Sequence, residues 1–479
     1  EANLLQYLRL AEQQHDWAEA QSILQALGEV YERIGSRAEF RVLRQRVLGQ
    51  IGIYQSEAKA KGRDAFNFWM YLRGMDAKDA LAVANWEGAK AIYKEILDEL
   101  TIISDASVNE KIAGLYHNLG YLAQEQRHFD EAVAYYQKAL QIREDVGDFY
   151  NAATDYLELG VMAQKQRYFD EAVAYYQKSL EIFEDAGDLH SAASAYHQLG
   201  TVAQEQRRFD KALAYYQKAL QIYENMGAFY DAAREYHQLG MVAQEHKHFD
   251  KAVTYYQKAL QIYEDEGTFY DAAREYHQLG MVAQKQRNFD EAFAYYQKAL
   301  QIYEDKGTFY DAAREYHHLG MVAQEQKHFD EAVTYYKKAL QIYENARDLY
   351  YAADEYHQLG VVAQEQRRFD EATAFYQKAF EIREQFQDWR KASSTLSQWG
   401  NLLEIQEKWA EALQIYLHAF AINLQHNEEW IGWDIRNLGR ILKVIGTSQF
   451  ESAWQQVTGE DCPEQLRSAI QAASEENQE

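Results

Sequence analysis

The chain has 479 residues, a net charge of −26, and 47% hydrophobic and 26% charged residues. The apolar content excludes a disordered chain. The negative charge argues against general nucleic-acid binding and against anionic membrane surfaces, because phosphate contacts need clustered lysines and arginines.

Neither a signal peptide nor an apolar stretch of about 18 residues, the length that a membrane span needs, is present. The single cysteine, Cys462, has no second cysteine to pair with, which predicts a reducing compartment, the cytoplasm. The first residue is Glu1 rather than methionine, so we expect the sequence to be a segment of a longer protein.

Residues 1–110 show helical patterns without a fixed period. The stretches that begin at Trp17 and Trp86 each read like the start of the second helix of a pair. We expect about three irregular helical pairs here, which cap a stack or connect it to other domains.

Residues 111–425 repeat a motif every 40 residues. The motif reads YHNLG at 116–120, YLELG at 156–160, YHQLG at 196–200, 236–240, 276–280 and 356–360, YHHLG at 316–320 and LSQWG at 396–400. Such a period is typical of a stacked array, in which each unit buries its apolar face only against its neighbours.

One unit, residues 231–267, contains two helical patterns joined by a tight corner. Apolar and small residues recur at helical spacing in the first half around Tyr236 and in the second half around Tyr256. Gly267 stands where a helix ends in a left-handed residue. Arg347 and Gln387 occupy this position in later units, so we expect slightly different corners there.

The spacing of Tyr236, Leu239-Gly240, Ala252, Tyr256 and Ala259 resembles the tetratricopeptide repeat. The period is 40 residues instead of the family's about 34, and Glu264 stands in place of its proline. The longer form is similar to the repeats of kinesin light chains and to the sensor regions of bacterial STAND ATPases and CHAT proteins. The resemblance implies an all-α fold, a right-handed solenoid of antiparallel helix pairs.

Residues 426–479 begin with a degenerate first-helix pattern around Leu438-Gly439. The period is lost after residue 446. Phe450, Trp454 and Val457 predict a capping helix, because a terminal repeat must cover its open face. We expect the last residues to be frayed.

Motifs of catalysis are missing from the sequence, which contains no GxxxxGK[ST], GxGxxG, HExxH or CxxC pattern. We therefore expect no enzyme activity, no catalytic residue and no cofactor.

The matching positions of tetratricopeptide repeats often contact ligands, so the resemblance implies a concave groove lined by the first helices. The expected contact residues are Arg234, His237, Gln238, Met241, Gln244, Arg274, His277, Gln278, Met281, Gln284, Arg314, His317, His318, Met321, Gln324, His357 and Gln358. The arginines can grip a carboxylate or an acidic peptide. Alternatively, each arginine pairs with the aspartate three residues before it, and the two roles are compatible.

The histidines at one repeat position form a predicted ladder with three interpretations. Metal binding is disfavoured, because neighbouring helices lie about 8–10 Å apart whereas zinc–nitrogen bonds measure about 2.0–2.1 Å. A pH-sensing role is chemically open. The simplest interpretation is neutral imidazoles that hydrogen-bond across adjacent repeats.

We therefore predict a non-catalytic array that binds a protein or peptide ligand in its groove. By resemblance, it is the sensor or regulatory part of a bacterial signalling protein whose effector or NTPase domain lies in the missing part of the chain. The alternative is a structural scaffold or oligomerisation platform without a dedicated ligand.

Overall fold

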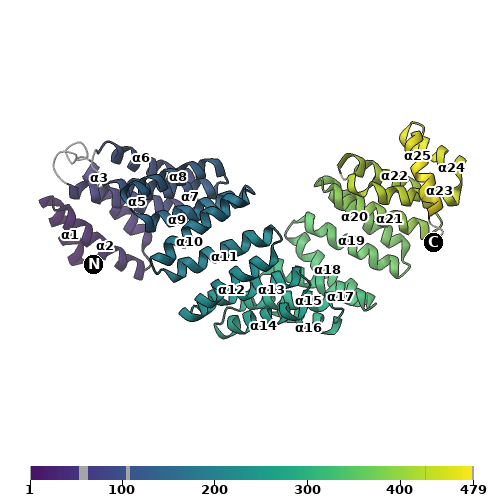
Figure 1. The fold of residues 1–479 in the computed structure, drawn as a ribbon, viewed down its shortest axis with the longest axis horizontal. Helices are drawn as coiled ribbons and strands as arrows, with labels where there is room; N and C mark the ends of the chain where they lie inside the picture. Colours follow the sequence, from purple (N-terminus) through teal and green to yellow (C-terminus); the bar gives the residue numbers. More distant parts are fainter. Residues whose placement is uncertain (1, 53–62, 104–107, 427, 477–479) are drawn as a thin grey trace. The chain divides into compact units, whose positions relative to one another are not determined.

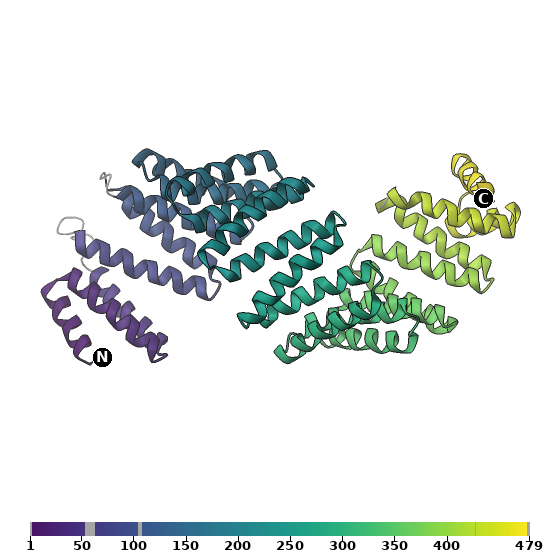
Figure 2. The same ribbon diagram turned by 60° about the horizontal axis from the view of Figure 1, so that its bottom comes forward.

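The computed structural model describes residues 2–52, 63–103, 108–426 and 428–476. These residues form helices and no strand, and successive helices pack as antiparallel pairs, which confirms the all-α solenoid (Figures 1 and 2). The chain divides into two compact units, Glu1–Met226 and Gly227–Glu479. The predicted segment boundaries at residues 110 and 425 stay predictions.

The described residues of the first unit form five helices without a fixed period, followed by three regular pairs. Its helices are α1 (Ala2–Gln14), α2 (Trp17–Arg33), α3 (Arg37–Gly52), α5 (Arg63–Ala82), α6 (Trp86–Thr101), α7 (Asn109–Glu125), α8 (Phe129–Val146), α9 (Phe149–Lys165), α10 (Phe169–Asp185), α11 (Leu189–Glu205) and α12 (Phe209–Met226). Pairs form between α1 and α2 and between α5 and α6, whereas α3 packs against both α2 and α5.

The second unit contains five regular pairs and a C-terminal cap. Its helices are α13 (Phe229–Glu245), α14 (Phe249–Asp265), α15 (Phe269–Lys285), α16 (Phe289–Lys306), α17 (Phe309–Glu325), α18 (Phe329–Asn345), α19 (Leu349–Glu365), α20 (Phe369–Gln385), α21 (Trp389–Ile405), α22 (Trp409–His426), the 3-10 turn η2 (Glu428–Trp430), α23 (Ile431–Ile445), α24 (Thr447–Thr458) and α25 (Glu464–Glu476).

Within each pair, a glycine of the first helix rests on a buried tyrosine of the second. A Cβ atom added to Gly240 would lie 2.5 Å from Cε1 of Tyr256, and one added to Gly280 would lie 2.7 Å from Cε1 of Tyr296. Both rings are fully buried. The Leu-Gly element of the motif is therefore a packing requirement, because only glycine lets the ring approach the helix backbone.

The C-terminal end departs from the pair pattern. Helix α24 packs against α22, and α25 packs against α23. A Cβ atom on Gly439 would lie 3.0 Å from the carbonyl oxygen of Ile470, so α25 takes the place that a second helix holds elsewhere. The insertion of α24 explains why the period is lost after residue 446. Helix α25 continues to Glu476, and residues 477–479 of the predicted frayed tail lie outside the described residues.

The corners between pairs share one backbone form. Gly267 and Gly307 have φ values of 71° and 70°, in the left-handed region. Arg347 and Gln387 adopt the same conformation with slightly smaller φ values of 58° and 56°. The corner geometry is thus imposed by the packed helices on either side of it, even where no glycine is present.

Among the described helices, none combines the length and the apolar character needed to cross a membrane.

Candidate functional site

The expected contact residues of the second unit all lie on the first helices of four consecutive pairs, α13, α15, α17 and α19. We call the surface that these helices form the first-helix face. Histidines join them: Nδ1 of His237, His277 and His317 lies 2.7, 2.8 and 2.8 Å from a glutamate oxygen of the next first helix. Consecutive first helices therefore lie side by side.

The glutamates of these pairs are buried and were missed by the sequence analysis. Glu275, Glu315 and Glu355 are at most 2% exposed, and His237 and His277 are 8% exposed. The two imidazoles lie between the helices, beneath the surface, and serve packing between repeats. The available signal was a carboxylate directly before the packing tyrosine of each motif, on the apolar stripe of the helix.

The C-terminal end of the histidine ladder has different electrostatics. At His317, burial opposes the charged form, but the hydrogen bond and the negative charge of Glu355 outweigh it and raise the pKa. His357 faces Thr395 and Arg383 instead, with Nδ1 3.3 Å from Oγ1 and 3.4 Å from Nη1. Burial, followed by the charge of Arg383, lowers the pKa of His357 to about 4.

The three arginines lie on the first-helix face with about half of each side chain exposed, at 56%, 53% and 48% for Arg234, Arg274 and Arg314. Each guanidinium also lies 3.4–3.7 Å from the aspartate three residues earlier in its own helix. Such exposed pairs contribute only about 0.2–1 kcal/mol, so the arginines can still engage a carboxylate.

The glutamines divide into two groups. The carbonyl oxygens of Gln284 and Gln324 accept hydrogen bonds from the buried hydroxyls of Tyr296 and Tyr336, both at 3.0 Å. Gln244 accepts the same bond from Tyr256 at 3.3 Å. These amides fix the corner of their pair and leave only the NH₂ group for other contacts. The second group is partly exposed on the first helices and consists of Gln238, Gln278 and Gln358.

A cavity of about 510 Å³ opens between α15 and α17. It brings together four of the expected contact residues, Met281, Gln284, His318 and Met321. The remaining lining residues are Lys285, Arg287, Phe289 and Glu325. The other expected positions, Met241 among them, are partly exposed on the neighbouring helices or buried as described above.

His318 replaces the glutamine of the other repeats at the edge of this cavity. Its ring stacks on Tyr296, with ring centres 4.9 Å apart, and contacts the ring of His277. Burial, and then electrostatic interactions with His277, His317 and Arg314, lower the pKa of His318 well below its usual value. Nδ1 of this imidazole has no hydrogen-bond partner among the described residues. His318 is thus a neutral polar group with one nitrogen unsatisfied.

Among the residues that the structure describes, no three histidine, cysteine, aspartate or glutamate side chains come together as metal ligands would. Cys462 is buried, and burial raises the pKa of its thiol.

Comparison with solved structures gives relatives of low sequence identity. A Signal Transduction ATPase with Numerous Domains (STAND) protein with a tetratricopeptide repeat sensor from Pyrococcus horikoshii is 14% identical, with a TM-score of 0.51 over 77% of this chain and 55% of that chain. BtubC (BKLC) from P. vanneervenii is 22% identical, with a TM-score of 0.41 over 47% of this chain and 92% of that chain. A Rap protein complexed with competence and sporulation factor is 15% identical, with a TM-score of 0.41 over 78% of this chain and 99% of that chain.

At this identity the STAND protein shows a shared fold and no more. Among curated proteins, none matches the sequence. The family model of the tetratricopeptide repeat matches residues 111–185, 191–265, 271–345, 311–385 and 351–425, which together cover more than half of the chain. The chain belongs to the tetratricopeptide repeat family.

Proposed function

We propose that this array is a non-catalytic binding module that takes a protein or peptide segment on the first-helix face of its second unit. The observation that carries the proposal is the cavity between α15 and α17, where Met281, Gln284, His318 and Met321 converge. Pockets with an apolar lining and a few polar groups are the usual sites of side-chain recognition.

The chemistry around this cavity fits an acidic segment with an apolar side chain. Met281 and Met321 offer adaptable apolar contacts. The unsatisfied nitrogen of His318 offers one hydrogen bond. Lys285 and Arg287 line the cavity, and Arg274 and Arg314 are half-exposed on the same two helices. Glu325 is the one lining residue that opposes this charge.

We further propose that the array is the sensor part of a larger signalling protein. Support comes from the STAND protein, in which a tetratricopeptide repeat sensor with the same fold accompanies a signal-transduction ATPase. An effector or NTPase domain on the same polypeptide is the corresponding expectation, and the cytoplasm is the expected compartment.

Binding of short acidic peptides with one central apolar residue tests the proposal. Replacing Arg234, Arg274 and Arg314 by glutamine should weaken binding by roughly tenfold or more, because each arginine contributes a charged contact. Charge-matched replacement of Lys251, Lys337 and Lys378, which are exposed on the second helices, should leave binding unchanged. Equal affinity of both triple variants would remove the arginines from the site.

A smaller change tests the cavity itself. His318→Gln introduces the residue that the other repeats already accommodate at Gln238, Gln278 and Gln358, so the fold should be kept. We expect the variant to alter peptide selection without changing the thermal melt. Identical peptide selection by the variant and the wild type would place the contact elsewhere on the face.

One observation favours the second candidate function, an oligomerisation platform. Phe229, Phe269 and Phe309 begin successive first helices and are 54%, 48% and 64% exposed. A row of exposed aromatic residues is typical of an interface. Light scattering over a range of protein concentrations distinguishes the two, because a platform associates at high concentration and a binding module stays monomeric.

A further inference from the structure

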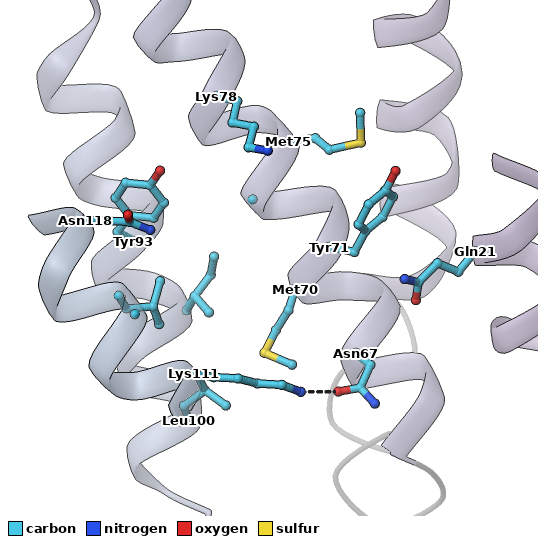
Figure 3. Close-up of a pocket in the computed structure, with 14 residues that line it drawn as sticks. Gln21, Asn67, Met70, Tyr71, Met75, Lys78, Tyr93, Leu100, Lys111 and Asn118 are labelled. Atoms are coloured by element: carbon cyan, nitrogen blue, oxygen red, sulfur yellow. Dashed lines mark hydrogen bonds between the residues drawn. The ribbon is translucent and has the colours of Figure 1, made fainter. Parts of the chain in front are cut away.

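A second cavity, of about 680 Å³, lies in the first unit and is unrelated to the first-helix face (Figure 3). Helices α2, α5, α6 and α7 form its walls. Its apolar lining comes from Met70, Met75, Ile96, Leu100 and Leu115, together with the rings of Tyr71 and Tyr93. The volume is larger than the cavity of the second unit. A large apolar side chain fits into such a space.

Two glycines in the interior of helices open onto this cavity. Gly74 of α5 and Gly114 of α7 both line it, and a Cβ atom added to either would meet no heavy atom within 4 Å. This differs from Gly120 of the same helix, where a Cβ atom would lie 2.8 Å from the ring of Tyr136. Packing inside the chain therefore does not require Gly74 or Gly114.

Glycine inside a helix destabilises it relative to alanine, so neither helix propensity nor packing favours Gly74 or Gly114. The position of Gly114 holds Thr154 and Ser194 in the next two repeats, which shows that the helix accepts a side chain there. An empty space in front of a glycine lets a ligand approach the backbone closely. The absence of a side chain at both positions leaves this part of the cavity open.

The polar groups around the cavity indicate the chemistry of that occupant. Lys78 and Lys111 lie at opposite ends of it in Figure 3. Nζ of Lys111 donates a hydrogen bond to Oδ1 of Asn67 at 2.8 Å, and Lys78 has no ion pair with another described residue. In a chain with a net charge of −26, two cations beside an apolar cavity are complementary to a ligand with negative charge at both ends.

Three amides complete the lining, from Gln21, Asn67 and Asn118. An amide side chain both donates and accepts hydrogen bonds, as a peptide group does. A fatty acid offers hydrogen-bonding atoms at one end alone. A peptide backbone offers them along its length, to Gln21, to Asn118 and to the NH₂ group of Asn67, whose Oδ1 accepts from Lys111.

We propose that this cavity binds a peptide segment with one large apolar side chain flanked by carboxylates. The apolar side chain enters between α5 and α7 above the two glycines, the backbone pairs with the amides, and the carboxylates meet Lys78 and Lys111. The site is separate from the first-helix face of the second unit and does not depend on the function proposed for that face.

Short fluorescein-labelled peptides with a central leucine, methionine, phenylalanine or tryptophan between glutamates are the probes, measured by fluorescence anisotropy. We expect at least one to bind roughly tenfold or more tightly than the same peptide with a central serine, because the apolar side chain leaves water. Replacing the glutamates by glutamine should weaken binding, and dodecanoate should not compete.

Gly74→Leu and Gly114→Leu fill the cavity and improve helix propensity. We expect both variants to melt at the wild-type temperature or above and to lose the peptide. Gly49→Leu is the matched control, because Gly49 of α3 also faces open space but does not line this cavity. The control should bind normally.

Three results would overturn the proposal: no central apolar residue improves on serine, both leucine variants bind like the wild type, or dodecanoate displaces the peptide. The triple variant of Arg234, Arg274 and Arg314 must retain this binding. Loss of binding in that variant would assign the peptide to the first-helix face and remove it from this cavity.

Discussion

The close contact between Gly280 and Tyr296 predicts how much stability the protein loses when a single methyl group is added at position 280. In Gly280→Ala, the new Cβ would lie 2.7 Å from Cε1 and 2.8 Å from Cδ1 of a ring that is fully buried. The ring is also held by the hydrogen bond from its hydroxyl to Gln284 at 3.0 Å. Overpacking of this kind costs about 1–3 kcal/mol. The higher helix propensity of alanine offsets about 0.8–1 kcal/mol of this cost.

A second glycine isolates the packing cost from the propensity. Gly74→Ala faces open space, so we expect it to stabilise α5 by about 0.5–1 kcal/mol. The free energy of unfolding changes in both variants, and the difference between the two changes measures the clash with Tyr296 alone. It should be about 1–3 kcal/mol. Repeats contact only their neighbours, so the loss in Gly280→Ala should be local to α15 and α16.

Native-state hydrogen exchange read by mass spectrometry on peptides from α15 and α16 measures this effect. We expect faster exchange there in Gly280→Ala and unchanged exchange in α5. In a Tyr296→Leu background the alanine should cost less than in the wild type, because the ring is gone. A change of stability of the same amount and sign in both alanine variants would contradict a clash at Gly280, and so would additive effects of the changes at 280 and 296.

Three further changes test separate contacts. In Glu315→Leu, Nδ1 of buried His277 loses its acceptor, so the free energy of unfolding in urea should fall by about 1–3 kcal/mol. Glu315→Gln keeps an acceptor and should cost less. Because the folded pKa of His357 is about 4 and its usual value is 6.5, the unfolded chain binds a proton first as the pH falls. The free energy of unfolding is therefore not reduced by this residue above pH 6.5. Between pH 6.5 and pH 4 it falls, by at most about 3 kcal/mol. Between these pH values the melting temperature of His357→Gln should fall less than that of the wild type. His328 is exposed, and His328→Gln should behave like the wild type. Arg347 has a left-handed backbone with φ of 58°, which glycine adopts without strain. Arg347→Gly should therefore increase the free energy of unfolding by about 1 kcal/mol and raise the melting temperature. An unchanged melting temperature would show that the corner is unstrained.

The helices were predictable because packing residues recur in phase. Tyr236 and Tyr256 mark the buried sides of α13 and α14, and both side chains are at most 8% exposed. The end of the chain was harder, because α24 interrupts the order in which a second helix follows a first. Gly439 has the usual motif, but α25 packs on it after an intervening helix.

The candidate site was predictable only as a set of equivalent positions. A period shows that His277 and His317 occupy the same place in two repeats, but it does not give the angle at which consecutive first helices meet. That angle decides which side chain turns towards the next helix. In this structure His277 turns towards the next helix and is buried against Glu315, whereas Arg274 stays half-exposed. The cavity of the first unit carried no periodic signal, since irregular helices form most of its walls.

Constant and variable positions within the array separate stability from recognition. The glycine of the motif and the buried tyrosine below it recur in every regular pair, including Gly400 and Tyr416 in the most degenerate one. On the first-helix face, by contrast, Arg314 gives way to Asp354 one repeat later, and His318 stands where other repeats have glutamine. The contact between glycine and tyrosine within each pair does not involve the exposed side chains of this face, whereas Asp354 pairs with Arg383 and with Lys391 of the next repeat. Under the function that we propose, changes at exposed positions such as Arg274 would alter what the face binds at little cost to the fold, so the differences between repeats at such positions are where a ligand preference can be encoded.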